Sequence, residues 1–186
     1  LLAVLQKLAS VPDAEFQQEN AKHAIIGVCR DLRGIAASTH NRQTYSAVFE
    51  LVYGSHHQRA PTFAALQRAL QIWVHEPAVT TAIFKFMLEF VFNKNQRLVF
   101  PQSSPNGILL FREASALLVT YGRRIVAHQP TEDAYQEKYK GISICLQMLS
   151  RALAGNYVNF GVFRLYEDKA LDDALSVALQ LALCVV

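Results

Sequence analysis

Hydrophobic side chains recur at helical spacing through most of the chain. In the clearest case they are alternately four and three residues apart, in a stripe made of Tyr135, Tyr139, Ile142, Leu146, Leu149 and Leu153. The helix before it carries a second stripe, made of Leu110, Ala114, Leu117, Tyr121 and Ile125. The other sides of that helix carry Arg112, Ser115, Arg123 and Arg124. Both patterns predict amphipathic helices, each with one face in a core.

Residues that favour helix ends mark several boundaries. Pro61 and Pro77 suit the start of a helix, and so does Pro105, which follows Ser104, a good N-cap. Gly155 is expected to end the helix that carries the first stripe. Together with the periodicity, these signals predict earlier helices at 15–38, 43–53, 62–75 and 78–93.

The predicted helix 78–93 is apolar almost all round, so we expect it to have neighbours on two sides. Lys85 and Glu89 are four residues apart on it and are expected to form an ion pair. No alternating strand pattern of useful length accompanies the helices, and the short run from Arg97 to Phe100 has no partner segment.

Helix pairs are predicted to begin near residues 16, 62 and 105, a spacing of about 45 residues. HEAT and armadillo repeats have this length, and they stack so that each pair covers the hydrophobic face of its neighbour. Charged residues are only 18% of the chain, which fits such stacking. The pattern therefore predicts an all-α, HEAT/armadillo-like helical-repeat solenoid (an α-α superhelix). A closed helical bundle is the alternative.

Both ends of the sequence are hydrophobic. Leu1 begins it without a capping residue, and the last six residues, Leu181 to Val186, are five apolar side chains around a cysteine. The terminal repeats of a solenoid need a polar outer face, and neither end provides one. We therefore expect residues 1–186 to be a single run of HEAT-like helix pairs cut from a longer solenoid.

Composition argues against several classes of function. The net charge is +3 and the basic residues are scattered, which does not favour nucleic acid. The longest apolar tract, Ala174 to Val186, is shorter than the about 20 residues of a bilayer span, so no membrane role is expected. Cys29, Cys145 and Cys184 lie far apart in apolar stretches and are interpreted as reduced core thiols, which fits the cytosol or nucleus.

No motif predicts catalysis, a cofactor or a metal site. The segment Gly155 to Gly161 has bulky side chains between its glycines, so we interpret it as a turn and not a phosphate-binding loop. His56 and His57 are adjacent but lack further ligands at helical spacing. No serine or cysteine has the local sequence of a nucleophile elbow, so we do not expect the chain to be an enzyme.

Six basic residues on long helices are the candidate partner-binding residues. They are Arg30, Arg33, Arg123, Arg124, Lys138 and Lys140. All are expected opposite the core stripes, where the concave wall of a solenoid would present them to an acidic partner. A plain solvated helix face is the alternative for most of them.

Several strings resemble the exportin 7 family of importin-β-like receptors, which also includes a close Ran-binding paralogue. They are C-R-D-L-R-G-I-A (Cys29 to Ala36), H-E-P-A-V-T-T (His75 to Thr81), S-S-P-N-G-I-L-L-F-R-E (Ser103 to Glu113), K-G-I-S-I-C (Lys140 to Cys145) and Y-V-N-F-G-V-F-R-L-Y (Tyr157 to Tyr166). Together they cover nearly the whole chain from Cys29 onward, and the stretch resembles the C-terminal half of the family.

The resemblance implies a HEAT-repeat receptor that carries protein cargo through nuclear pores. Its implied partners are GTP-bound Ran, the cargo and the phenylalanine-glycine (FG) nucleoporins, and it would shuttle between nucleus and cytoplasm. GTP would be bound by Ran and not by this chain. Receptors of this class are usually acidic, whereas this segment is slightly basic.

Two other functions remain open. The first is a scaffold solenoid that binds proteins without Ran. The second is an α-helical enzyme, which would need a pocket where polar groups of perturbed protonation converge.

Overall fold

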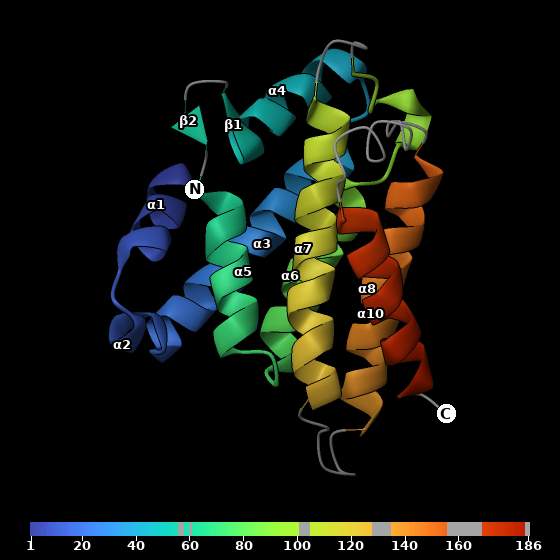
Figure 1. Cartoon of the computed structure of the whole chain (residues 1–186). Coiled ribbons are helices and arrows are strands. Elements are labelled where there is room, and N and C mark those ends of the chain that lie inside the picture. The colour runs from blue at the N-terminus through green and yellow to red at the C-terminus, as the bar shows by residue number, and fades with distance from the viewer. Residues whose placement is uncertain (56–57, 60, 101–104, 128–134, 156–168, 185–186) are drawn as a thin grey trace.

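The structure, a computed structural model, describes residues 1–55, 58–59, 61–100, 105–127, 135–155 and 169–184 (Figure 1). Helices make up nearly all of the regular structure in this part, which confirms the all-α prediction. The α-helices are α1 (Leu2–Ser10), α2 (Asp13–Phe16), α3 (Glu19–Ser38), α4 (Arg42–Tyr53), α5 (Thr62–Ile72), α6 (Pro77–Phe90), α7 (Asn106–Ala127), α8 (Tyr135–Ala154) and α10 (Ala170–Leu183). A short 3-10 helix, η1 (Lys94–Gln96), follows α6, and β1 (Gly54–Ser55) pairs antiparallel with β2 (Gln58–Arg59).

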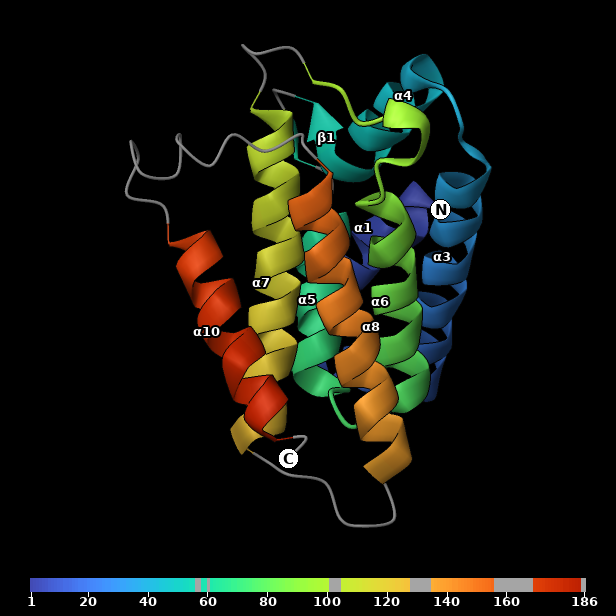
Figure 2. The same ribbon diagram turned by 90° about the vertical axis from the view of Figure 1, so that its right-hand side faces the viewer.

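The long helices form two layers. Helices α1, α5, α7 and α10 lie side by side in one layer, and α3, α6 and α8 lie side by side in the other (Figures 1 and 2). Within a layer each helix packs mainly on its immediate neighbours. Segments far apart in the sequence therefore meet only when they belong to adjacent repeats.

Neighbouring helices within a layer run in the same direction. Near the start of α3, Lys22 reaches Glu76 just before α6, and near the C-terminal end of α8, Arg151 reaches Glu89 near the end of α6. The two layers run opposite to each other, since Gly141 near the start of α8 lies against Tyr121 near the end of α7. Stacked antiparallel hairpins produce this arrangement, so the structure is a helical-repeat solenoid and the closed bundle is excluded.

The repeat length of about 45 residues holds for two pairs, α5–α6 and α7–α8, which begin at Thr62 and Asn106. The first predicted pair is wrong. In the structure, the first pair consists of α1, which the pattern did not predict, and α3. Helix α4 is an extra element across one end of the layers, where Tyr45 and Phe49 pack against Phe90 of α6.

The predicted helix 15–38 is divided into α2 and α3. Gln18 takes an extended conformation between them (φ −75°, ψ 152°), although glutamine favours helices. The turn is held by a distant contact, because the ring of Phe16 stacks on Trp73 with centroids 5.1 Å apart. Tertiary packing therefore overrides the local preference.

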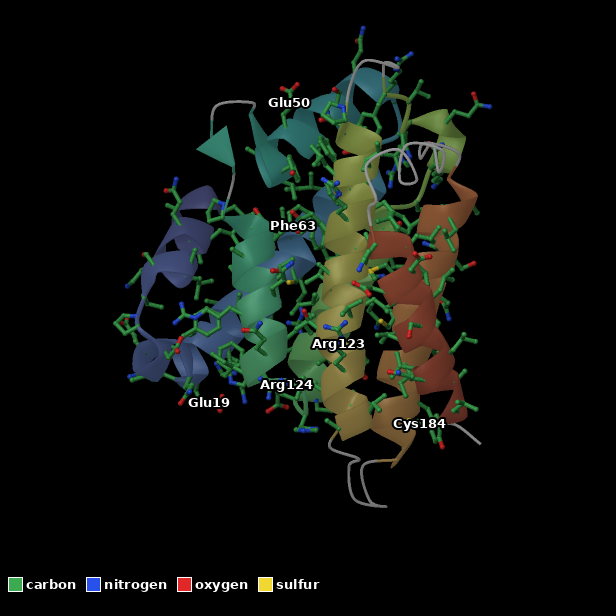
Figure 3. All side chains as sticks on the ribbon, viewed as in Figure 1. Glu19, Glu50, Phe63, Arg123, Arg124 and Cys184 are labelled. Atoms are coloured by element: carbon green, nitrogen blue, oxygen red, sulfur yellow. The ribbon has the colours of Figure 1, made fainter. Side chains whose placement is uncertain are left out.

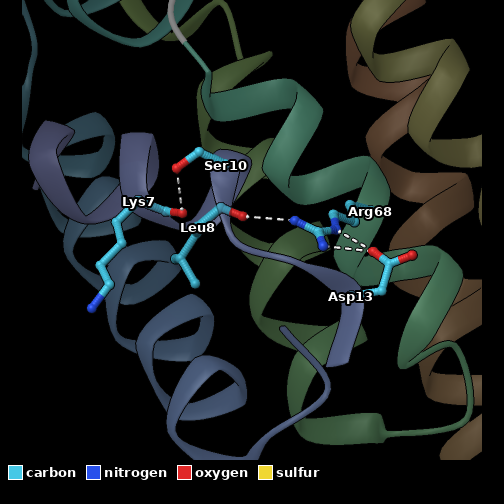
Figure 4. A network of polar contacts seen from close by, with 5 residues as sticks. All are labelled: Lys7, Leu8, Ser10, Asp13 and Arg68. Carbon is cyan, nitrogen blue, oxygen red and sulfur yellow. Dashed lines mark hydrogen bonds and ion pairs between the residues drawn. The ribbon is translucent and has the colours of Figure 1, made fainter. Parts of the chain in front are cut away.

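Arg68 of α5 holds the link between α1 and α2 in place (Figure 4). It donates hydrogen bonds to the carbonyl of Leu8, at 3.1 Å, and to the carboxylate of Asp13, and its guanidinium lies 4.2 Å from the ring centroid of Phe16. Ser10 satisfies the carbonyl of Lys7 at the end of α1. One side chain thus fixes the first repeat onto the second.

Helix α6 lies between α3 and α8 at the centre of its layer. Ile83 and Phe86 on one side and Phe84 and Met87 on another are fully buried, which confirms the expected packing on two sides. The expected Lys85–Glu89 ion pair is wrong, because the Glu89 carboxylate lies 3.5 Å from Arg151 of α8 instead.

The predicted stripe of α7 is confirmed, since all five of its residues are buried. The stripe of α8 is only partly right. Ile142 and Leu149 are buried, but the most enclosed positions are Cys145, Met148 and Ala152. Because α8 packs on both α6 and α7, the centre of its buried face lies between the two neighbours.

Arg97 has the largest fully buried side chain among the described residues, and it joins the ends of two repeats. Its guanidinium donates to the carbonyls of Ala36 and Thr39 at the end of α3 and to those of Glu89 and Phe92 at the end of α6. A cation at two helix C-termini complements both helix dipoles and satisfies carbonyls that the helices leave open. The extended run that begins here thus has a structural role that the sequence pattern did not reveal.

Helix α10 exposes a row of leucines. Leu175, Leu179 and Leu183 are 43%, 68% and 76% exposed, on the side away from Val177 and Leu181, which pack on α7. Large exposed apolar patches favour association. Among the described residues, no helix has both the length and the hydrophobicity that crossing a membrane requires.

We therefore expect the isolated 186-residue chain to self-associate through α10. Replacing Leu175, Leu179 and Leu183 with lysine should shift it to monomer without lowering its melting temperature, because these side chains are exposed. Analytical ultracentrifugation of both proteins measures this. A wild-type chain that stays monomeric at micromolar concentration would show that the row does not drive association.

Candidate protein-binding groove

A groove of about 540 Å³ crosses the layer formed by α3, α6 and α8. One wall is α3, with Cys29, Arg30 and Arg33. The start of α6 forms the floor, and Lys140 of α8 lies on the far side. The groove therefore brings together three helices from three successive repeats.

Helix geometry explains which side chains reach this groove. In α3, Cys29 and Leu32 are buried, so Arg30 and Arg33, three residues apart, lie on the exposed side. In α6, proline at the first position starts the helix, and Ala78, Thr81 and Ala82 follow on the groove side. These small side chains leave the floor open.

The groove has a surplus of positive charge. Arg30, Arg33, Lys85 and Lys140 line it, and none of these four has an ion-pair partner among the described residues. Among the described residues that line it, Glu76 alone is acidic. The cations therefore remain available to a ligand.

Glu76 shares Lys22 of α3 with Glu19, so one ammonium faces two carboxylates. The Lys22 Nζ lies 2.8 Å from the Glu19 carboxylate and 3.1 Å from the Glu76 carboxylate. Hydrogen bonds to Glu19 and then to Glu76 raise the pKa of Lys22 above its ordinary value, so the ammonium stays charged at neutral pH. The Lys22–Glu76 ion pair lies at one end of the groove and leaves the charges of its four cations uncompensated.

The six basic candidates do not share one wall. Arg30, Arg33 and Lys140 meet in the groove, whereas Arg123 and Arg124 are exposed on α7 in the opposite layer (Figure 3). The expectation of one common wall is therefore wrong for that pair, because α7 belongs to the layer of α5 and α10. Lys138 lies two residues before Lys140 on α8, and its side chain lies outside the described residues.

Lys85 is the groove residue that sequence reasoning missed. Its spacing from Glu89 suggested an intrahelical pair, but Glu89 turns to α8. The available signal was the run of small residues at Ala78, Thr81 and Ala82, which follow the same side of α6 one and two turns earlier.

The described residues of the groove offer no activated nucleophile. Cys29 borders it but is fully buried, and desolvation raises the pKa of its thiol well above the ordinary value, as it does for Cys145. Both are core thiols, as predicted. Cys184 is only partly buried at the end of α10, so the core interpretation is wrong there.

A second hollow, of about 470 Å³, lies between α5, α7 and α10. Its charges are mixed, with Arg112 and Lys169 near Asp173. Ser115, expected on an outer side of α7, is buried beside it, and its hydroxyl has no hydrogen-bond partner among the described residues. Nowhere in the described part of the chain do three or more His, Cys, Asp or Glu side chains form a group that could hold a metal.

Sequence comparison relates this chain to several much longer proteins. It is 47% identical to Exportin-7-B of Xenopus laevis and 42% identical to Ran-binding protein 17 of Homo sapiens, in both cases over its whole length. Exportin-7 of Dictyostelium discoideum is 39% identical over 95% of the chain. Its sequence matches one segment of the proteins of the exportin 7 family. It spans 17% of the length of each of these relatives.

No protein-family model and no solved structure matches the chain. Three of the strings that resemble the exportin 7 family contribute residues to the groove. Cys29 to Ala36 lies on α3, His75 to Thr81 leads into α6, and Lys140 to Cys145 lies on α8. The other two strings fall wholly or partly outside the described residues, as do His56 and His57.

Proposed function

We propose that this chain is part of a nuclear export receptor that carries protein cargo. The observation that supports this most is the 47% sequence identity between this chain and two exportin-7 proteins along its entire length. A solenoid suits the role, since its helix rows present long surfaces to other proteins. The chain has no catalytic task and no cofactor of its own in this proposal.

The proposed transport depends on GTP-bound Ran, and three of the relatives carry names that state Ran binding. The receptor would load cargo with Ran-GTP in the nucleus, pass FG nucleoporins and release the cargo in the cytoplasm. GTP would be bound by Ran alone.

Coupling between Ran and cargo would come from bending. Repeats that contact only their neighbours share a small rotation at each interface, so two ligands that favour the same curvature strengthen each other. Such coupling is typically about 1 to 3 kcal/mol, which is about 5-fold to 150-fold in affinity. No residue of this chain needs to touch the nucleotide.

The test uses the full-length protein and Ran loaded with GDP or with a non-hydrolysable GTP analogue. Binding measured by surface plasmon resonance is expected to be at least about tenfold stronger for the GTP form, since the nucleotide gives transport its direction. Equal affinity for both forms would contradict the proposal and favour a scaffold that works without Ran.

A further inference from the structure

We propose that the groove across α3, α6 and α8 binds an acidic stretch of a protein partner. Side-chain carboxylates of that stretch would pair with Arg30, Arg33, Lys85 and Lys140. This deepens the proposed function by stating the chemistry of a partner, and it rests on that function only for the partner's role as cargo.

The first argument is the unmatched charge. Four cations from three helices line one hollow, and none has an ion-pair partner among the described residues. Like charges held near each other repel, and an acidic ligand removes that repulsion. Arg30 and Arg33 can each hold a carboxylate through two parallel hydrogen bonds, which adds directional preference.

The second argument is the shape of the site. A volume of about 540 Å³ is that of a small binding site, and the floor at Ala78 and Ala82 has almost no side-chain bulk. An extended peptide can therefore lie against α6 while its carboxylates reach to α3 on one side and to Lys140 on the other. At the end of the groove, Glu76 repels further acidic side chains and so limits where the stretch can lie.

Nucleic acid fits this groove less well. None of the described residues that line it is aromatic, so these residues give bases no surface on which to stack. The basic residues form a compact group and not a long stripe that could follow a phosphate backbone. The observations therefore favour an acidic polypeptide.

The experiment measures binding of a fluorescent synthetic peptide of alternating glutamate and alanine to the full-length protein. Fluorescence anisotropy is read with three variants: Arg30→Glu with Arg33→Glu, Lys85→Glu with Lys140→Glu, and the matched control Arg123→Glu with Arg124→Glu. Each variant changes the net charge equally. Five of the six positions are exposed and Lys85 is partly buried, so circular dichroism checks that every variant folds. A glutamine–alanine peptide and a single-stranded RNA serve as competing probes.

We expect each groove variant to weaken peptide binding at least about tenfold and the control variant less than about twofold. An equal loss in all three would show that only net charge matters, and it would overturn the proposal. Absent binding, equal binding of the glutamine peptide, or tighter binding of the RNA would overturn it too. Ran binding is read in parallel, because the proposed function fails if Ran-GTP does not bind, whatever the peptide does.

Discussion

Replacing Arg97 with methionine is expected to lower the free energy of unfolding by about 3 to 5 kcal/mol. The substitution keeps much of the side-chain volume but removes a buried cation that satisfies four backbone carbonyls at the ends of α3 and α6. It also removes the contact between the guanidinium and the ring of Tyr45, whose centroid is 4.7 Å away. Urea unfolding followed by circular dichroism measures the change, in the background of the α10 lysine substitutions so that association does not interfere.

Arg33→Met is the matched control for Arg97. Arg33 is exposed and has no ion-pair partner among the described residues, so the same substitution there should change the free energy of unfolding by less than about 0.5 kcal/mol. Similar losses at both positions would mean that the buried hydrogen bonds of Arg97 contribute nothing particular to stability.

Gly122→Ala is expected to lower the free energy of unfolding by about 2 kcal/mol, although alanine favours helices more than glycine. A Cβ at Gly122 would clash with the Cγ1 of Val177 and lie 3.1 Å from the Cδ1 of Leu181, both on α10. Valine has little rotamer freedom in a helix, so α7 and α10 would have to move apart. Urea unfolding measures the loss, and adding Val177→Ala should recover part of it.

Gly34→Ala on α3 is the control for that substitution. A Cβ there meets nothing within 4 Å, so only the helix preference acts and the free energy of unfolding should rise by about 0.5 to 1 kcal/mol. The same sign of change at both glycines would show that close approach of α7 and α10 does not require Gly122.

The groove illustrates how far local sequence could lead. Periodicity placed Arg30 and Arg33 on the outer side of their helix, and the structure agrees. It could not show that they meet Lys85 and Lys140, because those residues are about 50 and about 110 positions away along the chain. It also grouped them with Arg123 and Arg124, since all six basic candidates were expected opposite core stripes and periodicity does not say which layer a helix joins.

The sequence by itself determined the helical character of the chain, the repeat length and the buried face of α7, because each depends on side chains within a few turns of one another. The exportin 7 resemblance was also readable from its strings. Only the tertiary structure decided the break before α3, the pairing of Glu89 with Arg151, the burial of Arg97 and the assembly of the groove. Each of these is fixed by a partner on another helix, and a contact between helices produces no periodic pattern in the local sequence.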